Sequence, residues 1–350
     1  MNAINQVDEN FYGEPCHDLL YQGMKQEFSF DANADFAAWK QELRERFLDV
    51  TGVSRIEQNA APARNVEIEY EQKMEGYTKI RFTFESEIGT RVPCWLLVPD
   101  TGKEKYPVAI TLQGHSTGAH NSVGEIKFEK DADYQTRGKF GIQAVENGYA
   151  ALCIEQRGMG ERKPTVKSRK APGCTYTALT ALQLGRTLIG ERMFDVRCAI
   201  DVLADFDKCD TDKILITGNS GGGTASFYCA CYDERIKLSV PSCSFCPYRE
   251  SILEIYHCAC NYIPSAYRYF DMQDLSALIA PRPLAIVAGQ LDTIFPIDAV
   301  RRGYETVKEI YRAAGAADAC NLVETPREHW WCVDIVWPTI NAAAEKLGWK

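Results

Sequence analysis

The chain has 350 residues, of which 45% are hydrophobic and 25% charged, a composition typical of a globular protein with a large core. Its formal net charge is −9 and it has no long basic run, which argues against nucleic acid as a partner. No apolar run reaches the ~20 residues that a membrane span needs. The polar first 15 residues do not resemble a secretory signal. We therefore expect a cytoplasmic protein with no membrane partner.

Hydrophobic periodicity predicts helices and strands that alternate along most of the chain. The predicted strands are 66–70, 79–85, 92–98, 108–112, 149–154, 214–216, 236–240, 283–288 and 321–324, and the predicted helices are 35–50, 141–147, 184–206, 223–231, 298–313 and 333–347. This alternation predicts an α/β fold with a mostly parallel central sheet and helices on both faces. The first three strands should form an antiparallel edge of that sheet.

Two segments lie outside the alternating pattern. Residues 1–64 carry one predicted helix and are expected to be an N-terminal extension that packs on the main domain. Residues 243–275 interrupt the alternation and are rich in tyrosine, which predicts an aromatic cap insertion. The expected organisation is thus one catalytic domain over 65–350, with the cap inserted in it.

Residues 218–222 have the pattern Gly-x-Ser-x-Gly, directly after an apolar strand and directly before a predicted helix. This is the context of a nucleophile elbow, a sharp turn that raises a serine hydroxyl above the sheet edge. Glycines avoid side-chain clashes in such a turn. We therefore predict that Ser220 is a nucleophile and that the backbone N–H of Gly221 faces an oxyanion. The alternative is a glycine-rich turn that holds an incidental serine.

A serine nucleophile needs a base, and the chain has only five histidines. His17 lies in the N-terminal extension, His115 and His120 follow an early strand, and His257 lies in the cap. His329 follows the last predicted strand, in a loop that should reach the same sheet edge as the elbow. The order serine, acid, histidine also matches that of the fold with this elbow. His329 is the predicted base, and a surface histidine beside two tryptophans is the alternative.

The acid that orients the base should leave the preceding strand, and Asp292 follows the predicted strand 283–288. Asp298 is the rival, but it stands at a helix start, where an aspartate commonly caps free N–H groups. A second oxyanion donor should come from the loop after strand 108–112. The backbone N–H of His115 is the candidate there, and its side chain is given no acid–base role.

The chain contains 14 cysteines, which is unusually many. Disulfides explain them poorly in a reducing compartment. The pattern Cys243-x-x-Cys246, followed by Cys258 and Cys260, makes a zinc site conceivable. Most of the other cysteines lie in apolar runs, where cysteine behaves as a small hydrophobe. We favour scattered buried thiols and predict neither a metal nor a cofactor.

Together these residues resemble the alpha/beta-hydrolase superfamily and, within it, the dienelactone hydrolase and acetyl xylan esterase/cephalosporin C deacetylase group. The resemblance covers roughly residues 65–350. The esterase group has Arg-Gly-Gln-Gly after the fourth strand, where this chain has Arg-Gly-Met-Gly at 157–160. The group also has a glutamine after the nucleophile, where this chain has Gly221, and His-Glu at the base, where Glu328 precedes His329 and Trp330 follows it.

The resemblance implies a serine hydrolase that cleaves carboxylic esters with acetyl or other short acyl groups, including esters of sugars. A peptidase or amidase is the alternative, because the glycines after Ser220 also resemble prolyl-oligopeptidase-like peptidases. A non-catalytic module that kept the fold is a third hypothesis. We expect Trp330, Tyr256 and Tyr262 to line the substrate pocket, because aromatic rings suit flat apolar faces. A small-molecule ester is the expected partner, and the sequence leaves a homo-oligomer open.

Overall fold

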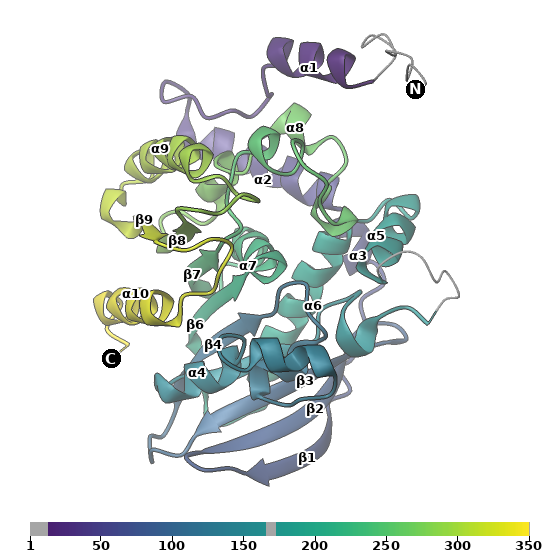
Figure 1. Cartoon of the computed structure of the whole chain (residues 1–350), viewed down its shortest axis with the longest axis vertical. Helices are drawn as coiled ribbons and strands as arrows, with labels where there is room; N and C mark the ends of the chain where they lie inside the picture. Colours follow the sequence, from purple (N-terminus) through teal and green to yellow (C-terminus); the bar gives the residue numbers. More distant parts are fainter. Residues whose placement is uncertain (1–12, 166–172, 350) are drawn as a thin grey trace, which may run out of the picture.

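A nine-stranded sheet forms the centre of the molecule in a computed structural model that describes residues 13–165 and 173–349 (Figure 1). The strand order is β1-β2-β3-β5-β4-β6-β7-β8-β9. The first three strands and β5 pair antiparallel, and all pairs from β5 to β9 are parallel. The strands are β1 Glu67–Lys73, β2 Tyr77–Glu87, β3 Thr90–Pro99, β4 Tyr106–Leu112, β5 Ala150–Ile154, β6 Cys209–Asn219, β7 Ile236–Ser242, β8 Leu284–Gly289 and β9 Cys320–Thr325. The predicted fold class and the antiparallel edge are confirmed. Most of the polar segment 1–15 lies outside the described residues.

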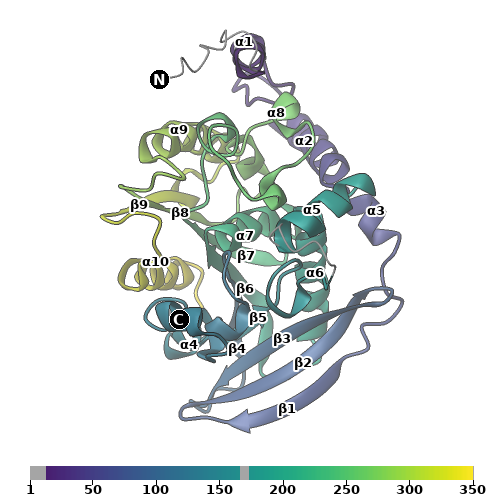
Figure 2. The same ribbon diagram turned by 45° about the vertical axis from the view of Figure 1, so that its right-hand side comes forward.

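Helices cover both faces of the sheet, as the sequence predicts (Figure 2). They are α1 Glu14–Gly23, α2 Phe36–Thr51, α3 Val53–Glu57, α4 Phe140–Glu146, α5 Gly173–Gln183, α6 Leu188–Leu203, α7 Gly221–Tyr232, α8 Ala266–Tyr269, α9 Ile297–Ala313 and α10 Val333–Lys346. The sequence did not predict α1, α3, α5 or the short α8. Helix α5 buries only small side chains and contains several threonines, so its apolar periodicity is weak. No helix among the described residues is both long enough and apolar enough to span a membrane.

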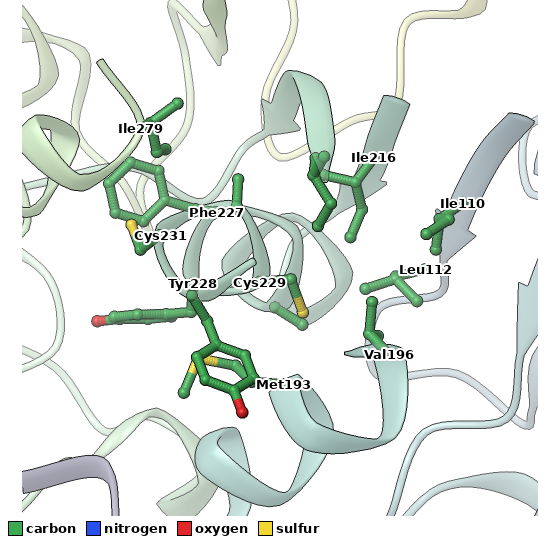
Figure 3. Close-up of a cluster of buried hydrophobic side chains, with 14 of the residues drawn as sticks. Ile110, Leu112, Met193, Val196, Ile216, Phe227, Tyr228, Cys229, Cys231 and Ile279 are labelled. Carbon is green, nitrogen blue, oxygen red and sulfur yellow. The ribbon is translucent and has the colours of Figure 1, made fainter. Parts of the chain in front are cut away.

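The two faces follow from the alternation of side chains along each strand. In β6, Ile214 and Ile216 belong to the larger core, whereas Leu215 points into the smaller core on the opposite face. The larger core includes side chains of α2, α6, α7 and α9, and the smaller core includes side chains of α4 and α10. Figure 3 shows α7 side chains among strand and α6 side chains of the larger core, with these labelled: Ile110, Leu112, Met193, Val196, Ile216, Phe227, Tyr228, Cys229, Cys231 and Ile279. This packing holds α7, and therefore the turn before it, against the centre of the sheet.

The N-terminal segment shares the larger core. Leu43 and Phe47 of α2 and Val53 and Ile56 of α3 are all buried there. The side chain of Asp35 caps α2, because it accepts hydrogen bonds from two backbone N–H groups of the first turn, at 3.0 and 3.1 Å. The segment thus packs on the main domain as expected, and a domain boundary at residue 64 stays a prediction.

Candidate active site

Ser220 occupies a strained turn between β6 and α7. Its φ of 57° and ψ of −127° are unusual for a residue with a side chain. The flanking glycines have no room for a Cβ atom, which would lie 2.4 Å from the Leu112 carbonyl oxygen at Gly218 and 2.0 Å from it at Gly222. The strand β4 therefore approaches the turn closely, and only glycine fits on either side of the serine.

His329 and Asp292 lie together beyond the ends of β9 and β8. The Nδ1 atom of His329 is 2.8 Å from Oδ2 of Asp292, whose side chain is fully buried. The other carboxylate oxygen, Oδ1, accepts hydrogen bonds from the backbone N–H groups of Ile294 and Phe295, at 2.8 and 3.1 Å. A carboxylate beside Nδ1 favours the proton on Nδ1 and leaves Nε2 free to accept one. The Phe295 ring stacks on the imidazole, with centroids 5.8 Å apart and planes at 19°.

One cavity of about 160 Å³ joins these groups, because both Ser220 and His329 line it. Its other walls come from the loop after β4 at residues 113–116, from residues 134–140, and from Trp331. The cavity contains polar and aromatic side chains in addition to the serine and the histidine. A small molecule bound there would contact the serine and the histidine at once.

Two backbone N–H groups are available beside Ser220. Gly221 begins α7, where N–H groups lack helical acceptors and the helix dipole favours negative charge. Within the described residues, neither the Gly221 N–H nor the His115 N–H has a hydrogen-bond acceptor. Gly114 lets the His115 loop approach, because a Cβ there would lie 2.7 Å from the Asn219 carbonyl oxygen and 3.2 Å from Cβ of Ser220. The strand, the strained turn with its serine, and the helix after it have the local structure of a nucleophile elbow.

A family model described as the Abhydrolase family matches residues 16–324, which is most of the chain. The chain belongs to the Abhydrolase family. The match begins before the segment 65–350 in which the sequence motifs lie, so the family covers α1, α2 and α3 as well.

Relatives of this Abhydrolase family member include a protein of Bacillus subtilis (strain 168) named "Putative hydrolase YtaP". It is 26% identical over 243 residues, which are 69% of this chain and 78% of that protein. A structure of a "putative acetyl xylan esterase" from Bacteroides fragilis NCTC 9343 is similar with a TM-score of 0.74 and 16% identity, over 91% of this chain and 84% of that one. A glucuronoyl esterase from Solibacter usitatus is similar with a TM-score of 0.66 and 15% identity, over 92% and 97% of the chains. At these identities the structures support the fold alone.

Three of the other histidines do not line the cavity. His120 is buried and its Nε2 is 2.9 Å from Oδ2 of Asp131. His257 is buried in the cap, with Nε2 3.2 Å from the Ser251 hydroxyl, and burial lowers its pKa. His17 lies in α1. Apart from His115, which also lines the cavity, His329 is the histidine that the structure brings to Ser220.

The predicted capping role of Asp298 is wrong. Helix α9 has Pro296 at its N-cap position and no side-chain capping hydrogen bond. Asp298 is exposed and forms an ion pair of 3.0 Å with Arg301 in the first turn of that helix. The acid bonded to His329 is Asp292, whereas the rival Asp298 is paired with Arg301.

The structure does not bring the three predicted substrate residues to the lining of the cavity. Tyr256 is 83% exposed, and Tyr262 lines a separate hollow between the cap and α1. Trp330 is 39% exposed, and its ring lies 3.7 Å beneath the guanidinium of Arg137, which does line the cavity. The aromatic residues in the lining are Tyr134, Phe140 and Trp331. Sequence reasoning missed Arg137 and Tyr134, because they lie in a charged loop without a recognisable motif.

The Arg-Gly-Met-Gly segment at 157–160 has a structural role behind the site. Arg157 is buried and its guanidinium contacts Asp195 at 2.8 Å and Glu87 at 2.6 Å. Nearby, Glu155 is buried, and burial raises its pKa to about 7 although the Ala119 N–H donates to it. These groups fix the end of β5 beside the loop after β4.

The cysteines are only partly scattered. Cys243 and Cys246 do not join Cys258 and Cys260, so the conspicuous C-x-x-C pattern is not one cluster. Instead, the sulfur atoms of Cys174, Cys258 and Cys260 gather with the imidazole of His115, and the four possible ligand atoms lie within 4.8 Å of one another. The preference for scattered thiols is therefore wrong for these three residues, while Cys94, Cys153 and Cys198 are buried in the two main cores as expected.

Proposed function

We propose that this Abhydrolase family member is a serine hydrolase that cleaves carboxylic esters through an acyl-enzyme intermediate. The observation that carries the proposal is the joint arrangement of Ser220 and His329 around one cavity, with Asp292 bonded to Nδ1 of the imidazole. Nucleophile, base and orienting acid are the three parts that this chemistry requires. The esterase names of similar structures agree with an ester substrate.

In the proposed first half-reaction, the Ser220 hydroxyl attacks the ester carbonyl carbon while Nε2 of His329 takes its proton. The carbonyl oxygen becomes an oxyanion, held by the N–H groups of Gly221 and His115. The C–O bond to the alcohol then breaks, and the imidazolium gives its proton to the leaving alkoxide. Water, deprotonated by His329, next attacks the acyl-serine. The C–O bond to Ser220 breaks, the imidazolium returns its proton to the serine oxygen, and the carboxylic acid is released. Asp292 stabilises the imidazolium in both halves.

The size of the cavity favours a short acyl group. Its volume of about 160 Å³ is well below the roughly 300–1,000 Å³ of sites for drug-sized ligands. Acetyl esters, including those of carbohydrates, fit this limit because the alcohol side can remain outside. A peptide would need extended binding on both sides of the bond, which this cavity does not provide. Relative rates on acetyl esters and on dipeptide amides test that preference.

The proposal is tested with Ser220→Ala and a matched serine variant, Ser116→Ala, which removes another hydroxyl from the same cavity. Hydrolysis of p-nitrophenyl acetate should fall by at least about 10⁴-fold in Ser220→Ala and remain close to the unmodified rate in Ser116→Ala. A fluorophosphonate probe should label the unmodified protein and Ser116→Ala but not Ser220→Ala. Full activity or labelling in folded Ser220→Ala would refute the assignment.

A further inference from the structure

Three cysteines and one histidine converge where the cap meets α5 and the loop after β4. Nε2 of His115 lies 3.6 Å from Sγ of Cys174 and 3.3 Å from Sγ of Cys260, and Cys258 completes the group. Around a tetrahedral zinc ion, bonds of about 2.3 Å to sulfur and about 2.0 Å to nitrogen place ligand atoms roughly 3.5–3.8 Å apart. The observed separations match that spacing closely enough for one ion to reach all four atoms.

A buried arginine supplies independent evidence that this cluster carries negative charge. Arg192 is 2% exposed, and its Nη2 lies 3.1 Å from Sγ of Cys174. Its other hydrogen bonds go to the neutral carbonyl oxygen of Arg157, at 3.2 and 2.9 Å. The nearby carboxylates Glu191 and Asp195 pair with Arg157, at 3.4 and 2.8 Å, and no ion pair to Arg192 is present among the described residues. A buried cation needs a compensating anion, and the sulfur cluster is the group it faces.

Zinc balances these charges. Three thiolates and one Zn²⁺ ion have a net charge of −1, which the guanidinium of Arg192 neutralises. Three bare thiolates would leave an excess of two negative charges in a partly buried place, and three neutral thiols would leave the guanidinium without a counter-charge. Thiolate and imidazole ligands in a tetrahedral set also favour zinc over the hard cations magnesium and calcium.

We propose that His115, Cys174, Cys258 and Cys260 bind one zinc ion in a closed, structural Cys₃His site. Four protein ligands leave no open position for water, so the ion has no part in the hydrolytic chemistry. It joins three segments that share little apolar surface, since the core cluster at this seam contains only Met159, Cys174, Ala178, Leu188 and Cys260 as buried members. Arg192 supports the site by donating to a ligand sulfur.

The site would also hold the loop that carries the proposed oxyanion donor. The ring of His115 lies against Gly221, where a Cβ would be 2.9 Å from both Nδ1 and Cε1. Coordination through Nε2 fixes that ring, and the backbone N–H of the same residue then has a defined position beside Ser220. Loss of the ion should therefore lower kcat as well as stability, although the ion never contacts the substrate.

The test is metal analysis of the full chain, purified without chelators and with any histidine tag removed. We expect about one zinc ion per chain in the unmodified protein and in Cys246→Ala, whose side chain is as buried as that of Cys260 but lies outside the cluster. The double variant Cys258→Ala/Cys260→Ala should contain none and should melt roughly 5–10 °C lower. Zinc content is measured independently of activity. A protein without zinc would therefore leave the proposed ester hydrolysis intact, and a protein without esterase activity would leave the proposed zinc site intact.

Cobalt substitution keeps the proposal testable if the double variant does not fold. Unmodified protein refilled with Co²⁺ should show thiolate-to-cobalt charge-transfer bands and the strong visible bands of a tetrahedral ion. Less than one tenth of a zinc ion per chain, combined with no uptake of zinc or cobalt by the reduced protein, would overturn the proposal. So would a full zinc content in the folded double variant, or a thiol titration that finds two cluster thiols joined in a disulfide.

Discussion

The carboxylate of Asp292 gives a sharp test of the proposed mechanism, because each of its two oxygens has defined hydrogen-bond partners. Oδ1 accepts from the N–H groups of Ile294 and Phe295, and Oδ2 accepts from Nδ1 of His329. In Asp292→Asn, the amide oxygen must stay with the two N–H donors, since an NH₂ group placed there would face two donors. The amide NH₂ group is then directed at the imidazole.

This orientation forces the wrong tautomer on the base. Nδ1 must accept a hydrogen bond from the new amide, so the ring proton moves to Nε2, which can no longer take a proton from Ser220. The same exchange in Ser-His-Asp hydrolases lowers kcat by about 10⁴-fold, equivalent to about 5.5 kcal/mol of barrier. The melting temperature should change little, because the two backbone hydrogen bonds persist.

The assay is steady-state hydrolysis of p-nitrophenyl acetate, with thermal melting of the same preparations. Asp298→Asn is the matched control, since that carboxylate is exposed and bonds only to Arg301 among its described neighbours. We expect kcat to fall in Asp292→Asn and to stay unchanged in the control. A loss of less than tenfold in kcat, in folded Asp292→Asn, would refute the tautomer argument and the role of the acid.

Two further predictions concern groups beside the cavity. Burial raises the pKa of Glu155 to about 7, so its contribution to stability is full below about pH 4.5 and is lost as the pH rises through 7. The free energy of unfolding should therefore fall by about 3 kcal/mol between pH 4.5 and pH 8, and Glu155→Gln should remove that fall. Urea unfolding measures it, and the same pH dependence of the unfolding free energy in both proteins would contradict the prediction. Trp330→Ala removes the ring under Arg137 and should lower kcat/KM about tenfold with a small change in melting temperature, since a cation–π contact is worth about 0.5–2 kcal/mol. A sharp drop in melting with unchanged kinetics would make Trp330 a packing residue instead.

The parallel part of the fold was predictable because its central strands contain short apolar runs, and some helices, such as α9, have strong apolar periodicity. Strand β6, for example, carries Ile214, Leu215 and Ile216 in a row, and all three are fully buried between two layers of helices. Helix α5 could not be found this way, because it packs through small side chains. Ser220, His329 and Asp292 could be predicted as candidates because the chemistry restricts both residue types and chain order, and the structure places His329 against Asp292.

The walls of the cavity and the cysteine cluster were less predictable, because both depend on how distant loops meet. Tyr262 points to a hollow beside α1, a direction set by the path of the irregular cap. His115 lies 59 residues from Cys174 and 145 residues from Cys260, so no local spacing announces the cluster. The C-x-x-C pattern is more conspicuous in the sequence, but it does not mark the cluster, because Cys243 lies beside Asp292 and His329 instead.

The cluster also gives a physical reason for a departure from the acetyl xylan esterase-like pattern. A glutamine follows the nucleophile in that group, whereas this chain has Gly221. In this structure the His115 ring occupies the space beside that position, and even a methyl group would lie 2.9 Å from two ring atoms. A ring coordinated to the proposed zinc ion could not move aside as a free side chain could, so the proposed site requires a glycine after Ser220. This contact can be tested. If the proposed zinc ion fixes the His115 ring, a variant that has lost the ion should tolerate a side chain at position 221 that the zinc-bound protein does not.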